Sequence, residues 1–377
     1  MKTLVKKNYK NILLFPLFLI AIVSLLRGIY NAYIRSHDFN YLPAVMAWEG
    51  KNHYLFMLEG GNFFASQNGE YLQALYILYY PFTLLSWEYA KISWMTINTL
   101  LAFFLPIFIG RKFELKNYTL LILVCLFLAG TPSRNVIGNG QLGLVIMAFL
   151  IIPFYFKSFF YILISGISYI KYNIGYLLFL YFISRGEIKK LTYSLIIIFL
   201  GWIIYCYITN SNLIDNLFQP LQLALHLKIT SEFPYGFSFL KILFSDFEYI
   251  EHLIYFFSIS LSLMLLFLIN RLKDNNLKVS QFCLIILFLS PHHIYDYVLL
   301  LPLLAYSLKN FFNGKVFQVN IIVIFYFYFG LRIMKEFGVN TDLNIMINYS
   351  NIAILAFLFC YNHIFYNSSI MKADLNK

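Results

Sequence analysis

Long hydrophobic runs separated by short polar connections occupy most of this chain of 377 residues. Residues 12–26, 92–109, 194–207 and 253–270 approach or reach the roughly 20 residues that an α-helix needs to cross a bilayer. A bilayer offers no water to unpaired backbone groups, so such runs are expected to be helical. The pattern therefore predicts an all-α, polytopic transmembrane helical bundle.

The remaining apolar runs continue this pattern to the end of the chain. Together with 12–26 and 92–109, the spans that we predict are 117–131, 141–156, 158–170, 174–184, 192–209 (which includes 194–207), 252–270 (which includes 253–270), 280–290, 294–308, 317–331 and 347–366. The shortest of them, such as 174–184, indicate broken helices or helices extended by neighbouring residues. The total is about 11 to 13 spans. No repeat or soluble segment interrupts the pattern, so residues 1–377 are predicted to form one integral-membrane domain.

Charged residues are scarce and unevenly distributed. They make up 12% of the chain, against 60% hydrophobic residues, which is about half the charged share of soluble domains. The net charge of +11 arises from basic clusters between the apolar runs: Lys2/Lys6/Lys7/Lys10, Arg111/Lys112/Lys116, Arg185/Lys189/Lys190, Arg271/Lys273/Lys278, Lys309/Lys315 and Lys372/Lys377. This distribution is typical of cytoplasmic loops and not of a nucleic-acid-binding surface. It predicts that both termini are cytoplasmic.

The first connection, residues 30–91, is predicted to be external. Within it, 71–87 is rich in Tyr and Trp and contains Pro81, so it could span the membrane or lie along the interface. A span here would place the cluster at Arg111 outside, against the charge rule, so we expect interfacial helices. Residues 210–251 are predicted to form a second external segment.

Two further features limit the class of protein. The four cysteines, at 125, 206, 283 and 360, lie within apolar runs and form no CxxC pair, which favours small buried or lipid-facing residues over disulfides or metal ligands. No small-x-small cleavage site follows Leu26, so the first apolar run is expected to remain as a helix.

Four polar stretches fall on the external side of this topology. The candidate residues in them are His37 and Asp38; Arg134, Asn139 and Gln141 within 130–141; Lys171; and His292, His293, Tyr295 and Asp296 within 290–297. Each stretch has an ordinary explanation, such as a helix cap, a turn, a lysine extended to the interface or a loop hydrogen bond. Their gathering on one face favours a substrate site, because ionisable groups at helix breaks usually line one. Asp38 is the most informative, because it directly follows the first helix.

These stretches, in this order, resemble glycosyltransferase family 87, membrane enzymes of the GT-C type that use polyprenyl-phosphate sugars and include bacterial α-mannosyltransferases. The residues that carry the resemblance are Asp38, Phe39, Tyr41, Ala44, Ala47, Gly50, Asn52 and Tyr54, then Tyr79-Tyr80-Pro81-Phe82, Gly140-Gln141, Lys171-Tyr172 and Ser290-Pro291-His292-His293 with Tyr295 to Tyr297. The similarity extends over about residues 12 to 310. His53, Tyr172 and Tyr295 depart from the family pattern, which leaves the sugar and the acceptor open.

The resemblance implies a hexosyltransferase, with mannose as the expected sugar, in the inner membrane of a bacterium and with its site on the external face. Asp38 is expected to act as the general base toward an acceptor hydroxyl of a glycan, glycolipid or other molecule, and direct attack implies inversion. Arg134, Asn139, Gln141, Lys171, His292 and His293 would bind the donor phosphate or sugar, and His37, Tyr41, Tyr295 and Asp296 would lie on the acceptor side. No Asp-x-Asp motif occurs, so neither a nucleotide-sugar donor, a cofactor nor an essential metal is expected.

Two other classes fit a polytopic protein with such polar residues. A flippase or transporter of lipid-linked sugars would be expected to show internal repeats and charges at the middle of the membrane. An O-antigen polymerase or ligase would be expected to carry arginines in a large late external loop, and residues 210–251 contain none.

Overall fold

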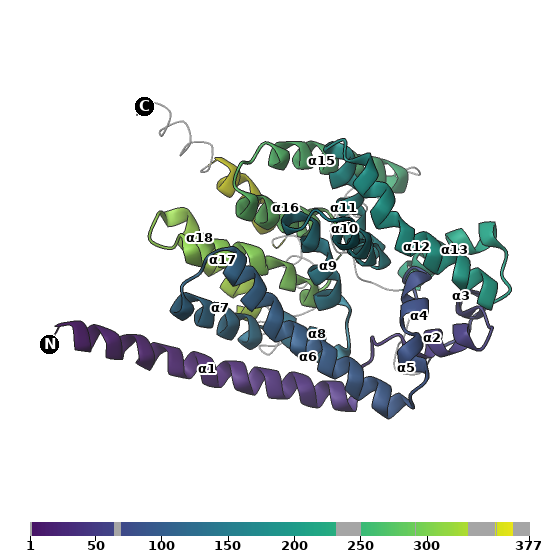
Figure 1. Ribbon diagram of the computed structural model, residues 1–377, viewed down its shortest axis with the longest axis horizontal. Helices are drawn as coiled ribbons and strands as arrows, with labels where there is room; N and C mark the ends of the chain where they lie inside the picture. The colour runs from purple at the N-terminus through teal and green to yellow at the C-terminus, as the bar shows by residue number, and fades with distance from the viewer. Residues whose placement is uncertain are drawn as a thin grey trace. The chain divides into compact units, whose positions relative to one another are not determined.

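The computed structural model describes residues 2–63, 69–230, 250–290, 292–330, 351 and 353–364, and over these residues it is helical with no strand (Figure 1). They divide into two compact units. We call residues 24–103 and 133–233 the first-loop unit, and residues 1–23, 104–132 and 234–377 the C-terminal unit. The predicted all-α architecture is confirmed.

The first-loop unit begins within the long first helix, α1 (Lys2–Ile34), and includes the first half of α6 (Trp87–Lys112). Its other helices are α2 (Tyr41–Trp48), α3 (His53–Leu58), α4 (Ala74–Leu78), α5 (Tyr80–Thr83), α8 (Thr131–Asn139), α9 (Gly143–Tyr155), α10 (Phe159–Ser165), η2 (Gly166–Ile170), α11 (Tyr172–Ser184), α12 (Ile188–Ile208) and α13 (Leu213–Thr230). Helices α2, α4 and α5 pack on one another, and α4 also packs on α12 (Figure 1).

Short helices fill the first connection. The segment 71–87, which could have spanned the membrane, forms α4 and α5 with five and four residues, both far below the length of a span. Helix α4 lies so close to α12 that a Cβ atom at Gly201 would be 2.5 Å from the Cα of Ala74. Glycine at this position therefore permits the contact that holds the first connection on a long helix.

The stretch around Gly130 is more ordered than a simple turn. Helix α7 (Asn117–Ala129) ends there, and α8 begins at once with Thr131 and Pro132, bent by 55° from α7. Proline suits the first turn of a helix because its missing N–H would have no intrahelical partner there. The polar residues between the predicted spans therefore lie on a helix, and the bent pair together is apolar enough for one broken span.

The C-terminal unit contains the N-terminal part of α1, the second half of α6, and α7. Its other helices are α15 (Ile250–Asn270), α16 (Asn275–Leu289), η4 (Ile294–Leu300), α17 (Leu301–Lys309), α18 (Lys315–Phe325) and the π-helical turn η5 (Tyr326–Gly330). Polar contacts tie its helix ends. Lys309 Nζ lies 2.9 Å from Glu114 Oε2, and the Asn276 side chain donates to the carbonyl of Lys112 at 3.4 Å. These contacts join segments from three of the basic clusters, and the side of the membrane on which they lie stays a prediction.

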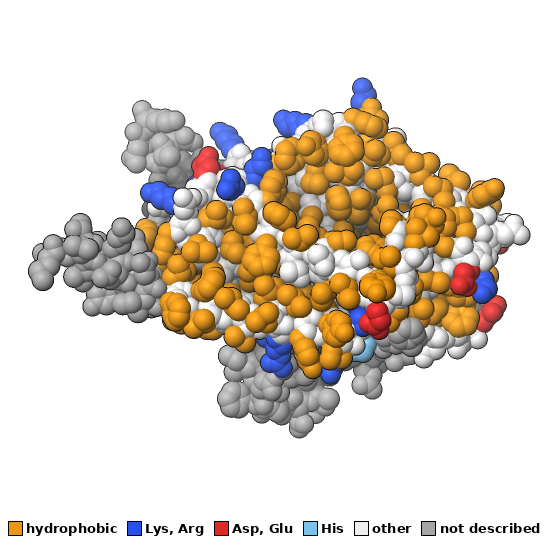
Figure 2. Space-filling view, turned by 60° about the horizontal axis from the view of Figure 1, so that its bottom comes forward, with side chains coloured by type: hydrophobic (Ala, Val, Ile, Leu, Met, Phe, Trp, Pro, Cys, Tyr) orange, Lys and Arg blue, Asp and Glu red, His pale blue; other side chains and the backbone are white. Residues whose placement is uncertain are grey.

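Membrane-length helices identify an integral membrane protein. Within the described part of the chain, Leu14–Ile34, Trp87–Lys112 and Ile188–Ile208 are long and apolar enough to cross a bilayer. Shorter apolar helices are α9, α10 with η2, α11, residues 256–270 of α15, α16, α18 with η5, and residues 353–364. Hydrophobic side chains predominate on the face shown in Figure 2. The polytopic bundle is confirmed, and the total of 11 to 13 spans stays a prediction.

Some sequence predictions concern residues outside the described ranges. Most of the second half of the external segment 210–251 and the beginning of the span 347–366 are among them. The first half of that external segment is helical, because α13 extends over 213–230.

The four cysteines are free thiols, of which Cys125, Cys206 and Cys283 are buried and Cys360 is exposed.

Candidate active site

The connection between α1 and α2 carries His37 and Asp38 in a short, closely hydrogen-bonded turn. The backbone N–H of Asp38 donates to the carbonyl of Asn139 at 2.8 Å, which ties the turn to the end of α8. The Asn40 side chain donates to the Asp38 carbonyl at 3.0 Å. These two bonds hold the backbone of Asp38 on both sides, while its side chain remains half-buried.

Phe39 anchors this turn in the first-loop unit. Its fully buried ring lies between two indoles, with ring centroids 6.0 Å from Trp87 and 5.4 Å from Trp94, and both pairs are stacked. The Trp94 indole N–H donates to the carbonyl of Gly140 at 2.8 Å. Aromatic pairs add about 0.5–1.5 kcal/mol each beyond the area they bury. The residue after Asp38 is therefore fixed by packing, and its partner Trp94 is fixed by the corner after α8.

Gly140 forms that corner. Its φ of +71° lies in the left-handed region, where residues with a Cβ atom are strained. A Cβ at this position would also lie 3.0 Å from the Cβ of Phe39. The backbone turn and the close approach thus both require glycine, and together they bring the next residue, Gln141, toward the Asp38 turn.

Residues from three separate segments surround the Asp38 carboxylate. The Gln141 amide hydrogen-bonds it, and His37 and Lys171 act on it by charge. Gln141 is 3% exposed and Lys171 is 5% exposed, so neither side chain extends into solvent. Lys171 sits at the break between η2 and α11. The structure thus brings together the first three of the four polar stretches, which the sequence separates by about 130 residues.

Burial and charge act in opposite directions on Asp38. Desolvation is the larger effect and raises the pKa of the carboxyl above its ordinary value, because a low-dielectric site disfavours the charged form. The hydrogen bond from Gln141 and the positive field of His37 and Lys171 lower it again in part. The result is a more basic carboxylate than a solvated aspartate, which is the property that a general base needs.

The other residues predicted in this unit are placed less directly. Arg134 and Asn139 lie half-buried on α8, and the carbonyl of Asn139 receives the Asp38 N–H. Tyr41 packs against Phe39 and Trp87, and its hydroxyl donates to the carbonyl of Leu85 at 2.7 Å. Tyr41 therefore has a structural contact, and its predicted place on the acceptor side stays a prediction.

The fourth polar stretch belongs to the C-terminal unit. His292 is buried, and its Nδ1 lies 3.0 Å from the carbonyl of Ser290. Asp296 is buried and accepts a hydrogen bond from the backbone N–H of His293 at 3.0 Å, in a capping box at the start of η4. The ring of Tyr295 lies 5.1 Å from that of His293. Their participation in the site of Asp38 stays a prediction.

A buried histidine, His53, was not among the predicted site residues. Its hydrogen bonds link distant parts of the first connection. His53 Nε2 lies 3.1 Å from the carbonyl of Gly69, and Nδ1 lies 2.8 Å from the hydroxyl of Tyr205. The Gly69 N–H donates to the Asn40 side chain at 3.0 Å, and Asn40 holds the Asp38 carbonyl. The sequence signal was present, because His53 departs from the family pattern, but its partners lie far away along the chain.

Lys91 is a second residue that the sequence pattern did not reveal. It lies within the apolar helix α6, is buried, and forms an ion pair with Glu88 at 2.8 Å. Its ammonium also lies over the rings of Tyr33 and Trp87, at 5.4 and 5.5 Å from their centroids. These contacts give Lys91 a structural role, because its ammonium lies over the Trp87 ring that stacks on Phe39.

Comparison with known proteins gives a match to a family model. The model of glycosyltransferase family 87 matches residues 74–292. This range includes Arg134, Asn139, Gln141 and Lys171, whereas Asp38 precedes it. No curated protein and no solved structure matches the chain.

Replacing Gly140 should disturb the packing of the Phe39 side chain. We expect Gly140→Ala to destabilise the protein by roughly 1–3 kcal/mol, because it combines left-handed strain with a close contact to a buried side chain. The measurement is the apparent melting temperature of the detergent-solubilised protein. Gly186→Ala is the matched control, because Gly186 also has a positive φ of +65° but no heavy atom within 4 Å of an added Cβ. Equal effects of the two substitutions would contradict the packing argument.

His53 should make stability depend on pH. Burial lowers the pKa of His53 to about 3 from its ordinary 6.5. The unfolded chain therefore binds a proton that the folded protein does not, and stability is lost as the pH falls below 6.5, by about 2 kcal/mol at pH 5. His53→Gln should flatten the dependence of the melting temperature on pH over this window. The exposed His226 offers His226→Gln as the control, and an unchanged pH dependence in His53→Gln would refute the assignment.

Proposed function

Because the chain belongs to glycosyltransferase family 87, we propose that it transfers a hexose, with mannose as the expected sugar, from a polyprenyl-phosphate donor to an acceptor hydroxyl. The protein is an integral membrane glycosyltransferase. The family match favours this activity over the transporter and the polymerase or ligase alternatives. Asp38 is the proposed general base.

One observation carries the assignment of the base. A half-buried carboxylate with a raised pKa lies among Gln141, His37 and the buried Lys171, and three distant segments converge to build this environment. Perturbed carboxylates beside a specific cation are frequent at functional sites. A positioned base contributes about 10²–10⁴-fold to a reaction in which a hydroxyl must lose its proton.

The transfer needs one displacement. The acceptor oxygen forms a bond to the anomeric carbon of the sugar while the bond from that carbon to the phosphate oxygen breaks. The hydroxyl proton passes to Asp38, and polyprenyl phosphate leaves with the electron pair of the broken bond. Direct attack inverts the anomeric carbon, so a β-linked donor would give an α-linked product.

A retaining mechanism would need a second carboxylate as nucleophile. Glu49 and Asp296 are the two other acids that could be considered for this role, and the contacts of both differ from those of a nucleophile. Glu49 is exposed and forms an ion pair with Lys51 at 3.0 Å. The Asp296 carboxylate accepts a hydrogen bond from the backbone N–H of His293 at the start of η4. These contacts support inversion by a single base.

The leaving phosphate needs a fixed positive charge. Lys171 is the strongest candidate, because a buried ammonium interacts with a phosphate far better than a solvated one does. Arg134 could supply a two-pronged contact to phosphate oxygens. His292 and His293, with Asn139 and Gln141, are the proposed donors to the remaining phosphate and sugar oxygens.

We propose that the site faces the external side of a bacterial inner membrane, with both termini in the cytoplasm. The ion pair of Lys309 with Glu114 and the contact of Asn276 with Lys112 support this orientation, because they join segments whose basic residues the charge rule assigns to the cytoplasm.

Asp38→Asn should remove the base with little change of shape. We expect transfer of labelled mannose from polyprenyl-phosphate mannose to membrane acceptors to fall by about 10²–10⁴-fold. The matched control is Glu49→Gln, which removes an exposed acid from the same connection and should leave transfer unchanged. Transfer by Asp38→Asn at the rate of the unmodified protein would exclude Asp38 as the base.

Lys171→Gln should shift the pH profile of transfer in a defined direction. The Lys171 charge lowers the pKa of Asp38, so its removal raises that pKa and leaves the base protonated up to a higher pH. The acid limb of kcat/KM should therefore move to higher pH, in addition to any loss of rate from weaker phosphate binding. An acid limb at its original position would show that Lys171 does not act on Asp38. Lys51→Gln, on an exposed lysine in the same unit, serves as the control.

A further inference from the structure

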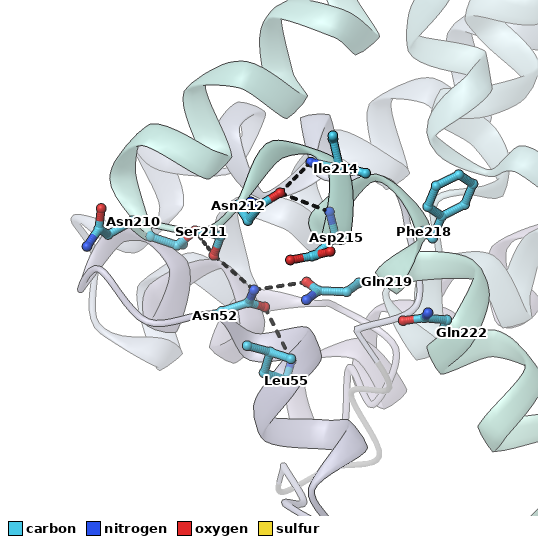
Figure 3. A pocket seen from close by; sticks show the side chains of 11 residues that line it. Asn52, Leu55, Asn210, Ser211, Asn212, Ile214, Asp215, Phe218, Gln219 and Gln222 are labelled. Carbon is cyan, nitrogen blue, oxygen red and sulfur yellow. Dashed lines mark hydrogen bonds between the residues drawn. The ribbon is translucent and has the colours of Figure 1, made fainter.

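A cavity of about 590 Å³ opens in the first-loop unit between the start of α3 and the connection from α12 to α13 (Figure 3). Asn52 and Leu55, at the start of α3, line one side, and nine residues between Thr209 and Gln222 line the other. Asp38, Gln141 and Lys171 are not among its lining residues, so the cavity is separate from the environment of the proposed base.

The floor of the cavity is preorganised by hydrogen bonds. The Asn52 amide donates to the hydroxyl of Ser211 at 3.0 Å and to the Gln219 carbonyl oxygen at 2.9 Å. Its own oxygen accepts from the N–H groups of Tyr54 and Leu55, as the dashed lines in Figure 3 show in part. Gln219 is buried and also accepts from Asn216 at 2.8 Å. The amides are therefore fixed in place before any ligand arrives.

Other polar side chains at the cavity are available to a ligand. Asp215 and Gln222 are exposed, and within the described chain their side chains make no hydrogen bond. Figure 3 shows the Asp215 carboxylate beside Gln219, with Gln222 on the next turn of α13. Amides and carboxylates that stand free at a fixed floor can donate to and accept from several hydroxyl groups of one ligand.

Apolar side chains complete the lining. Phe218 is 53% exposed, and Leu55 and Ile214 are also largely exposed while they line the cavity. A pyranose ring has a C–H face that packs against such side chains and hydroxyl groups that bind amides and carboxylates. The combination of one exposed aromatic ring with a fixed set of amides fits a sugar ring.

The charge of the lining decides which sugar ligand fits. Its eleven residues include one carboxylate, Asp215, and no lysine, arginine or histidine. A phosphate group would meet like charge without a cation to compensate, which costs binding energy. The sugar-phosphate headgroup of the donor is therefore disfavoured.

We propose that this cavity binds a neutral sugar unit of the acceptor glycan, away from the hydroxyl that reacts. The proposal rests on the proposed function, because it names the acceptor of that transfer. Asn52 is followed directly by His53, and the contacts of His53 with Gly69 and of Gly69 with Asn40 continue to the carbonyl of Asp38. The cavity and the base thus belong to one hydrogen-bonded connection.

The test measures sugar binding by the full chain in nanodiscs with saturation-transfer NMR. The probes are neutral pentasaccharides of mannose, glucose and galactose, with mannose 1-phosphate as the anionic comparison. We expect at least one pentasaccharide to bind, and Phe218→Ala and Gln222→Ala to weaken it by roughly 2- to 10-fold each. Both residues are exposed, so these substitutions should leave folding intact. Leu221→Ala, on an exposed residue of α13 that does not line the cavity, should bind as the unmodified protein does.

Several results would overturn the inference. They are the absence of binding for all three pentasaccharides, unchanged affinity in both cavity variants, or equally tight binding of mannose 1-phosphate at the cavity. The same binding measured in Asp38→Asn separates the two proposals. Retained binding with lost transfer supports both. Lost transfer in Asp38→Asn, with a cavity that does not bind sugar, would leave the base assigned and remove the acceptor subsite. Unchanged transfer by Asp38→Asn would refute the assignment of Asp38 as the base. The acceptor subsite would then be judged by the sugar-binding results alone.

Discussion

The packing of the buried Phe39 side chain is the interaction on which the candidate site depends. Its ring is stacked on Trp87 and Trp94, and its Cβ lies so close to Gly140 that a Cβ added there would be 3.0 Å away. Asp38 is the preceding residue, and Gln141 is the residue after Gly140. One buried aromatic contact therefore sets the distance between a carboxylate and the amide that hydrogen-bonds it. Close packing of this kind has discrete solutions, so the position of Asp38 is not freely adjustable.

Electrostatics at Asp38 balances two opposed effects. Burial makes the carboxyl more basic, while Lys171 and Gln141 keep the charged form accessible. A buried lysine without an anion would itself be costly, so the two groups also support each other's presence in a membrane protein. In the proposed reaction the same lysine would meet the phosphate of the donor. The proposed base and the proposed phosphate-binding cation thus lie in one small environment, as a transfer in which proton loss and phosphate departure occur together would need.

Polar groups in the first connection differ in kind between its two ends. The half-buried Asp38 lies near the buried cation of Lys171, whereas the cavity at Asn52 is lined by amides, hydroxyls and apolar side chains with one carboxylate. His53 lies between them as a neutral, buried ring with both nitrogens in contact. This difference in side-chain chemistry is the basis for proposing a phosphate site near Asp38 and a neutral sugar subsite at Asn52.

The sequence by itself determined the membrane class, the helical architecture and the identity of the main candidate residues. Apolar runs and basic clusters are local patterns, and the physics of the bilayer acts on them directly. The order of the polar stretches at 37–38, 130–141 and 171 also indicated the family. The helix at 131–139 was not expected, because its polar residues resemble a turn and its start depends on the break at Gly130.

Only the tertiary structure decided which residues meet. Trp94 reaches Gly140 across 46 residues, and Tyr205 reaches His53 across 152. No local pattern carries such pairings, because they depend on how helices pack and which side chains fill the space between them. The partners of His53, the packing around Phe39 and the cavity at Asn52 could therefore not be predicted from the sequence. The candidate residues could be named from the chain, whereas the environment that surrounds them arises from packing between distant segments.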